Sequence, residues 1–486
     1  MKPKSSIIST LASLLLLSGC SSWVQPPVRE LPASPSPESW ASADAAQQSL
    51  APQSWLRRLE DPLLETLVDE ALTANPQLQQ AQALLDQGSA QAIVAGAEQQ
   101  PNLNASLQAG RSDRGTVISN EFNLGLSFGW ELDLWDKLSD SARAAEINRQ
   151  ALEQDYSDAR LSLAARVTKG WFAAVEANQQ LQLSEHLVRV LASRLEVLEE
   201  GYRSGIVAAL DIHLARANLA AERSRLSTRE QALGNSVRNL ELLLGRYPSN
   251  HMSIGEQLPA LPKSIPAGLP SELLTRRYDI RAAQLRVESS WATLARSHKD
   301  RFPSFNLTAT LGTSSNEFDQ LLQGNSLVWS LLGGVTQPLL DGDRLEALEA
   351  QSLAQAQQRE ASYRDTVLQA FFEVEDALQQ EHQLRRFVQQ LELSVVESDL
   401  AETLAAEQYR SGLVEYITLL ESQRRAFDAR STFIQARNQQ LQNRIDLYLA
   451  LGGDFITEAD NDLSPELSSL EQSSPEPASS NDNASR

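Results

Sequence analysis

The residue types that most often carry chemistry form no catalytic pattern in this sequence. The metalloprotease spacing HExxH and the phosphate-binding pattern GxxxxGK[ST] do not occur. The letters of the nucleophile pattern GxSxG occur at 125–129, but inside an alternating strand-like stretch and not at the strand-to-helix turn that this pattern requires. The five histidines are spread singly from His186 to His382, and we interpret the nearby pair of Asp211 and His213 as incidental. A metal centre needs several ligands such as histidine close together, so the sequence predicts no metal site. Because no catalytic pattern is present either, it also predicts no enzyme and no cofactor.

The single cysteine, Cys20, carries the clearest chemical signal. Two lysines near the start precede an apolar run over residues 7–17, and small residues then lead directly to Cys20. A charged start, an apolar stretch and small residues are typical of a secretory signal. The pattern resembles the bacterial lipobox, so we expect Cys20 to receive lipid after residues 1–19 are removed. Ser21 at the next position indicates an outer-membrane address. The alternative is a cysteine that follows an ordinary cleavage site by chance.

The charge balance argues against nucleic acid as a partner. The chain has 486 residues, with 42 Lys and Arg against 63 Asp and Glu, a formal net charge of −21. Such an acidic chain repels phosphate backbones. No apolar run reaches the roughly 18 residues that a membrane-spanning helix needs.

The chain also contains an internal repeat with a period near 200 residues. The segment Tyr-Arg-Ser-Gly at 202–205 returns at 409–412, an offset of 207. An aromatic pair at 171–172 matches another at 371–372 at an offset of 200. If both matches hold, the second copy has seven extra residues between them. Seven residues are one heptad, so such an insertion would leave the same side of the helix turned toward its neighbours.

The repeat and the composition predict six parts of the chain. Each repeat is read as a helix (about 60–98 and 270–300), two strands and two very long helices. The parts are a signal peptide at 1–19, an extended lipidated tether at 20–54, a first repeat at 55–247, a Pro-rich linker at 248–270, a second repeat at 271–453 and an acidic disordered tail at 454–486.

Four stretches alternate between apolar and polar residues, as half-buried strands do. Alternation is strict over 122–132, is clear over 102–109 and 304–311, and is less regular over 327–335. An apolar face opposite a face of small polar residues and glycine favours a transmembrane β-barrel with a wet interior. A soluble sandwich with one wet face remains the alternative. Four strands cannot close a barrel and open edges are not tolerated in lipid, so a barrel would require association of several chains.

The predicted helices are too long for a compact globule. Residues 139–202 contain no proline, and residues 344–409 contain neither proline nor glycine. A continuous helix of 64 residues would span about 95 Å. Apolar residues at heptad spacing predict side-by-side packing, either in the wall of a tube or in an ordinary antiparallel coiled coil.

The order of these segments resembles the TolC family of outer-membrane efflux channels, and in particular its lipidated, OprM-like or NodT-type branch. The resemblance covers about residues 17–454 and includes the repeated Tyr-Arg-Ser-Gly turns. The other segments that carry it are Trp55, Asp61-Pro62-Leu63, Leu67, Ala71-Leu72, Asn75-Pro76, Leu78, Arg276–Ala283 and Phe302-Pro303-Ser304.

The resemblance implies a mixed α+β membrane protein. In this family three chains form a twelve-stranded transmembrane β-barrel, with four strands from each chain, which continues as a long periplasmic α-helical barrel. The implied function is a passive duct in a tripartite efflux system. Its implied partners are two further copies of the chain, a periplasmic adaptor (membrane fusion) protein, an inner-membrane transporter and outer-membrane lipid.

The resemblance also implies where function lies. Carboxylates near the two turns line the periplasmic constriction in this family, and a threefold ring of them would prefer cations and raise the pKa of each member. A solvated helix face is the alternative. The predicted gate residues are Asp211, Glu421, Tyr202, Tyr409, Arg203 and Arg410, and the predicted adaptor-docking residues are Ser204, Gly205, Ser411 and Gly412.

The sequence departs from the family archetype at the gate. Val414 and Thr418 stand where the archetype carries Arg and Asp, so its ion-pair lock is not carried over, and Arg203 or Arg410 could serve instead.

Two other classes of protein share some of these features. A periplasmic coiled-coil adaptor or scaffold lipoprotein would explain the long helices, but it would not need two copies of an alternating strand pair. A periplasmic enzyme or binding protein would need a site that the sequence does not present.

Overall fold

The computed structural model describes residues 31, 37, 39–42, 55–113, 115, 118–261, 270–321 and 327–453. The predicted signal peptide, Cys20 and the predicted acidic tail lie outside the described residues.

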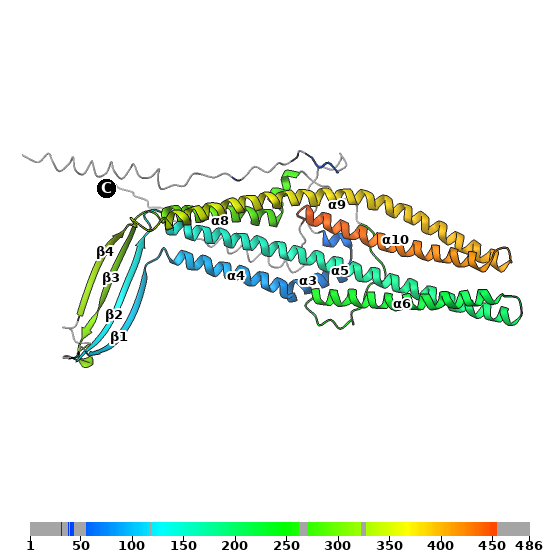
Figure 1. The fold of residues 1–486 in the computed structure, drawn as a ribbon, viewed down its shortest axis with the longest axis horizontal. Helices are drawn as coiled ribbons and strands as arrows, with labels where there is room; N and C mark the ends of the chain where they lie inside the picture. The colour runs from blue at the N-terminus through cyan, green and yellow to red at the C-terminus, as the bar shows by residue number, and fades with distance from the viewer. Residues whose placement is uncertain are drawn as a thin grey trace, which may run out of the picture. The chain divides into compact units, whose positions relative to one another are not determined.

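The same series of elements occurs twice along the chain (Figure 1). Each series has short helices, a strand, a second strand, a very long helix and a shorter helix that returns alongside it. The first series is η1 (Leu56–Leu59), α3 (Pro62–Ala74), α4 (Pro76–Ala97), β1 (Asn102–Asp113), β2 (Ile118–Leu132), α5 (Lys137–Arg203) and α6 (Ala209–Leu243). The second is η2 (Pro270–Glu272), α7 (Leu273–Arg276), α8 (Tyr278–Lys299), β3 (Ser304–Ser315), η3 (Phe318–Gln320), β4 (Leu327–Thr336), α9 (Arg344–Arg410) and α10 (Tyr416–Ala450).

The two long helices have equal lengths. Both α5 and α9 contain 67 residues, and both α6 and α10 contain 35 residues. Their first and last residues are related by the same offset of 207. The interpretation that a heptad is inserted within the second long helix was therefore wrong. The difference in spacing between the repeats arises before the long helices, in the strand region and its connections.

The first predicted helix, 60–98, is two helices because local capping interrupts it. Asp61 caps α3 by accepting hydrogen bonds from the backbone N–H groups of Leu63 and Leu64 at 3.1 and 3.2 Å. Asn75 ends α3 and caps α4, with its Oδ1 accepting from the N–H of Gln77 at 2.8 Å. A proline, which is pre-set for the first helical position, follows each cap. The second predicted helix, 270–300, is interrupted at Arg277.

The four strands form one antiparallel sheet in the order β1-β2-β3-β4 (Figure 1). The predicted strands are confirmed, and the register sets apolar residues opposite one another across all three strand pairs. The apolar pairs of the sheet include Leu103–Phe128, Leu126–Leu311, Phe305–Val335 and Leu311–Trp329. The other face carries mainly small polar residues and glycine, for example at the pairs Gln108–Asn123 and Thr310–Ser330. Side chains alternate between the faces because successive residues of a strand point in opposite directions.

Contacts divide the chain into two units, and each unit takes segments from both repeats. One unit contains Ala81–Tyr156 and Tyr278–Leu368, which include the sheet. The other contains Ser36–Gln80, Ser157–Arg277 and Gln369–Arg486, which include the helical hairpins.

In the sheet unit, polar contacts tie the strands to the helices that follow and precede them. The indole N–H of Trp135 donates to the carbonyl of Pro303 at 2.6 Å. Lys299, at the end of α8, forms an ion pair with Asp140 of α5 at 2.7 Å, and both side chains are buried. A buried pair is costly to break because a lone charge would remain, so these contacts fix where the sheet joins its helices.

In the hairpin unit, the core is aromatic and polar. Trp55 is fully buried and stacks on Tyr448 with ring centroids 5.7 Å apart. The indole N–H of Trp171 donates to Asp61 at 2.8 Å. Arg444 forms a buried ion pair with Glu381. These contacts join η1, α3, α5, α9 and α10 into one packed region.

We predict that two glycines with the same left-handed backbone differ in their tolerance of alanine. Gly245 has φ of +73°, and a Cβ there would lie 2.5 Å from the carbonyl oxygen of Ala74. Gly205 has φ of +76° with nothing within 4 Å of such a Cβ. Gly205→Ala should lower the free energy of unfolding by about 1–2 kcal/mol of backbone strain, and Gly245→Ala should lower it further because backbone must move. Unfolding followed by circular dichroism measures both, and equal losses would contradict the predicted close contact.

Candidate functional site at the helical turns

The first helical turn joins α5 to α6 by a tight reversal. The N–H of Ser204 and its hydroxyl both donate to the carbonyl of Glu200, at 3.1 and 3.0 Å. Gly205 then adopts a left-handed φ of +76°, which glycine reaches without a steric penalty. Its N–H donates to the carbonyl of Tyr202 at 2.9 Å. The helix therefore ends where the sequence places its glycine, as predicted.

The second turn, between α9 and α10, repeats this geometry. The N–H and hydroxyl of Ser411 donate to the carbonyl of Glu407 at 3.1 and 3.0 Å. Gly412 has φ of +70°, and its N–H donates to the carbonyl of Tyr409 at 3.0 Å. Ser204, Gly205, Ser411 and Gly412 are all exposed. The two turns thus present equivalent surfaces to solvent.

An apolar cluster beside the turns packs the two hairpins against each other. It contains residues from four helices, namely Leu198 of α5, Ile212 and Ala215 of α6, Ala405 of α9, and Tyr416 and Leu419 of α10. Tyr409 packs against this cluster, and its ring lies 5.5 Å from the ring of Tyr416. Burial of apolar surface therefore joins the first hairpin to the second near their turns.

Four of the candidate and neighbouring residues, Tyr409, Asp211, Tyr416 and Arg194, interact electrostatically. Burial, followed by the charge of Asp211, raises the pKa of Tyr409 above its usual value. Burial also raises the pKa of Tyr416 to about 12, with smaller contributions from Tyr409 and Asp211, while Arg194 opposes the shift. Asp211 of α6 is half-buried and lies close enough to both tyrosines for its charge to be felt.

The other predicted gate residues lie in more open positions. Glu421 is exposed and forms an ion pair with Arg424 at 3.2 Å. Arg203 pairs with Glu200 at 2.9 Å, and both side chains are about 70% exposed. Such exposed pairs contribute little to stability. Tyr202 is 51% exposed, and Arg410 is exposed.

Sequence reasoning missed Arg194 and Tyr416. The structure brings Arg194 close to Tyr416, and Tyr416 close to Tyr409 and Asp211. Leu191 and Leu195 belong to the apolar heptad pattern of the first long helix, and Arg194 stands between them. A positive charge next to this apolar stripe was the only sign in the sequence that could have pointed to Arg194. In the repeat alignment, Tyr416 stands where the first copy has Ala209, so this aromatic belongs to one hairpin only.

Neither a metal cluster nor a spanning helix emerges from the described part of the chain. No group of three or more His, Cys, Asp or Glu residues there could hold a metal ion. No helix among the residues that the structure describes is both long and apolar enough to cross a membrane.

Comparison with known proteins identifies the family. The model of the outer membrane efflux protein family matches residues 67–246 and 269–453. The chain therefore belongs to the outer membrane efflux protein family, which confirms the predicted relation to TolC-like channels. Its fold, mostly helical with four strands among the described residues, is that of these channels, and the chain serves as the outer-membrane channel of an efflux system.

Individual relatives match over nearly their whole length. The chain is 31% identical over 464 residues to outer membrane protein OprJ of Pseudomonas aeruginosa, covering 92% of this chain and 95% of that one. It is 26% identical to the probable outer membrane lipoprotein SilC of Salmonella typhimurium, over 92% and 98% of the two chains. The open-state crystal structure of the Neisseria gonorrhoeae MtrE outer membrane channel superposes with a TM-score of 0.78 at 26% identity, over 89% and 99%.

Proposed function

We propose that the chain is the lipid-anchored subunit of a trimeric duct. In this proposal the two helical turns dock a periplasmic adaptor, and the carboxylates beside them line the inner entrance. An inner-membrane transporter would supply the driving force and the cargo. The observation that carries the proposal is the open four-stranded sheet with an exposed apolar face.

The sheet edges support association of several copies. In the described chain, β1 pairs only with β2 and β4 pairs only with β3, so each outer strand has one edge without a partner. Unpaired backbone N–H and C=O groups are not tolerated in hydrocarbon, and closed single-chain barrels begin at about eight strands. Three copies of this sheet supply twelve strands, so that β4 of one copy pairs with β1 of the next.

The exposure of apolar side chains supports contact with lipid. On the outer strand β4, the large side chains of the apolar face are 59–74% exposed. They are Leu327, Trp329, Leu331 and Val335, whereas Val328 and Leu332 lie on the other face. On β1, Leu103 and Leu107 are 67% and 68% exposed. A contiguous apolar patch of this kind indicates a membrane or a protein partner.

Exposed apolar residues at the turns support their role in docking. Ile206 directly follows the first turn and is 83% exposed, and Leu413 follows the second and is 75% exposed. They occupy equivalent positions in the two repeats. An adaptor would bury these side chains together with Ser204 and Ser411, and threefold repetition would multiply each weak contact.

The inner entrance is proposed to be lined by Asp211 and Glu421. Asp211 lies beside the two tyrosines where the hairpins pack, so movement of one hairpin would change its surroundings. Glu421 follows on the exposed side of α10. In a trimer these residues would form two rings of three carboxylates, which attract cations.

The trimer is tested by the mass of the detergent-extracted particle, with planar-bilayer conductance on the same sample. We expect a particle of three chains that conducts ions, because closure of the sheet into a barrel gives hydrogen-bond partners to the open edges of β1 and β4. A water-soluble monomer that leaves bilayers silent would overturn the proposed duct.

Lipidation of Cys20 is tested by Cys20→Ser. Loss of the thiol should abolish incorporation of radiolabelled palmitate, since the thioether bond needs that sulfur. Mass spectrometry of the same protein shows whether the signal peptide has been removed. Normal palmitate labelling of the variant would refute lipidation at this position.

The gate residues are tested by Asp211→Ala combined with Glu421→Ala. Removal of six carboxylates from a trimer should lower the cation preference, measured as a reversal potential across a salt gradient in planar bilayers. The matched control is Glu230→Ala with Glu397→Ala, which removes the same charge from exposed positions elsewhere on α6 and α9. Equal effects of the two pairs would show that Asp211 and Glu421 act only through net charge.

A further inference from the structure

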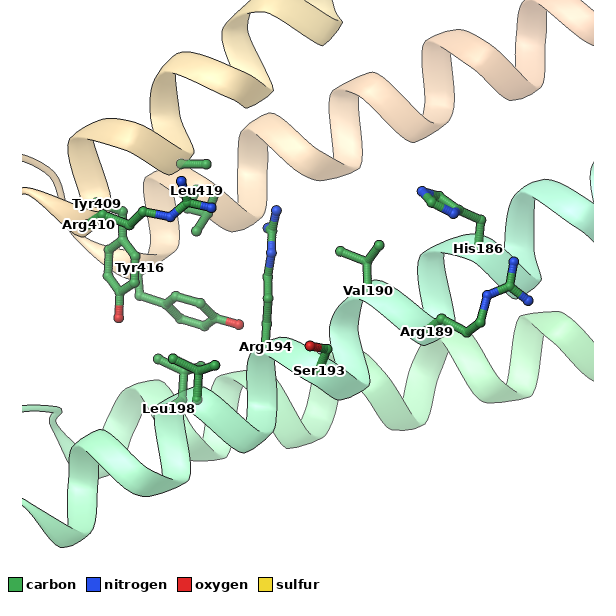
Figure 2. A pocket seen from close by; sticks show the side chains of 12 residues that line it. His186, Arg189, Val190, Ser193, Arg194, Leu198, Tyr409, Arg410, Tyr416 and Leu419 are labelled. Carbon is green, nitrogen blue, oxygen red and sulfur yellow. The ribbon is translucent and has the colours of Figure 1, made fainter.

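A pocket of about 530 Å³ lies between the two hairpins, within one unit of the structure. One wall comes from α5, and the opposite wall comes from the end of α9 and the start of α10. Figure 2 shows Arg194 reaching out from α5, with Arg410, Tyr409 and Tyr416 coming from the other hairpin. The volume falls within the range of sites that bind small molecules.

The lining combines positive charge with apolar surface. Three guanidinium groups, those of Arg189, Arg194 and Arg410, lie around the pocket in a chain whose acidic residues outnumber its basic ones. His186 adds a further nitrogen donor or acceptor. Apart from Ser193, the remaining wall is apolar or aromatic, and includes Val190, Val197, Leu198, Leu419 and the two tyrosines.

The positive charge in this pocket is incompletely paired. The nearest carboxylate to Arg194 is Glu402, at 3.8 Å, and Arg189 has Glu185 at 3.8 Å. Both distances exceed the 2.7–3.2 Å of a typical hydrogen bond. Arg410 has no ion pair among the residues that the structure describes.

The side chain of Arg194 also lacks a hydrogen-bond partner at one of its nitrogen atoms. Its Nη1 is buried and has no hydrogen-bond partner within the described chain. Burial lowers the pKa of Arg194, and the opposing effect of Glu402 is the smaller one. Leaving a donor of a charged group buried and unpaired is costly, so a ligand that accepted from it would be favoured.

We propose that this pocket binds a small organic anion, a carboxylate or sulfonate carried on an apolar or aromatic body. The anionic head would accept hydrogen bonds from Arg194 and Arg410, whose planar guanidinium groups suit two-oxygen acceptors. The body would lie against Val190, Leu198 and the ring of Tyr416. Because the walls belong to both hairpins, an occupant holds the hairpins together and stabilises their packing.

A second pocket in the sheet unit fits this chemistry less well. It has a volume of about 300 Å³ and contains Arg286 and Arg359, but the rest of its lining is Ser, Thr, Asn and Gln. Arg286 is already paired with Asp155. It therefore lacks both the apolar wall and the incompletely paired charge.

The test uses the full-length, detergent-extracted protein and isothermal titration calorimetry with 2-naphthoate. Neutral 2-acetylnaphthalene and cationic 2-naphthylmethylammonium have the same aromatic body, and titration into detergent alone corrects for partitioning into micelles. We expect the acid to bind at least about tenfold more tightly than the neutral compound, which corresponds to one charge-assisted hydrogen bond. The cation should not bind.

Variants locate the site. Arg189→Gln combined with Arg410→Gln should weaken binding of 2-naphthoate by about tenfold or more. Arg194 is left in place because its removal would also change the surroundings of Glu402, which lies 3.8 Å from its guanidinium group. Val190→Trp fills the pocket and should abolish binding while leaving every charge unchanged. The matched control is Arg223→Gln, an exposed arginine of α6 outside the pocket.

Three outcomes would overturn the proposal. These are absence of binding, equal binding of the acid and the neutral compound, and an equal loss in the Arg223→Gln control. Circular dichroism and particle mass of each variant distinguish loss of the site from loss of folding, and Val190→Trp tests the site independently of the arginines. Binding does not depend on the proposed trimeric duct, so the two proposals fail separately.

Discussion

The structure depends on one constraint, which is that β1 and β4 each have an edge without a partner strand among the residues that the structure describes. Four strands with an apolar face cannot satisfy their backbone groups in lipid, and they are too few to close on themselves. The chain therefore carries an unfinished sheet, with large apolar side chains such as Trp329 and Leu107 left exposed. Association of several copies would pair the open strand edges and place the apolar side chains against lipid or another copy. The sheet would therefore reach its final structure only in the assembly.

The repeat explains why the two helical hairpins of one chain end in equivalent turns. Helices α5 and α9 have the same length, and so do α6 and α10, so each hairpin turns back after the same number of residues. Left-handed Gly205 and Gly412 make equivalent turns at these ends. The two hairpins are nevertheless not identical. Tyr416 takes the place that Ala209 has in the first repeat, so at this position only the second hairpin has a buried aromatic ring. A duplicated scaffold thus acquires an asymmetric interior.

The sequence predicted the elements better than their junctions. Alternating apolar residues located the strands, and long stretches without proline located α5 and α9, because those patterns follow directly from strand and helix periods. The break at Asn75 was missed although Asn-Pro is a strong capping signal, since apolar periodicity continues across it. The heptad alignment was wrong because an aromatic pair can stand at any point along a long helix, whereas a turn glycine with positive φ has one structural position. The pocket containing Arg194 could not be predicted, because it requires the relative register of α5 and α9, which neither helix specifies alone.

The end of the molecule near the turns presents both signs of charge at short range. Asp211 acts on Tyr409 and Tyr416, and Arg194 acts on Tyr416 in the opposite direction. The two tyrosines therefore lie where a carboxylate and a guanidinium both come close to the packed hairpins. In partly buried surroundings the field of each charge is stronger than in open water. The carboxylate would favour cations, and the incompletely paired arginines would favour anions. Both preferences depend on how the hairpins pack at Tyr416, so a change in that packing would alter both together.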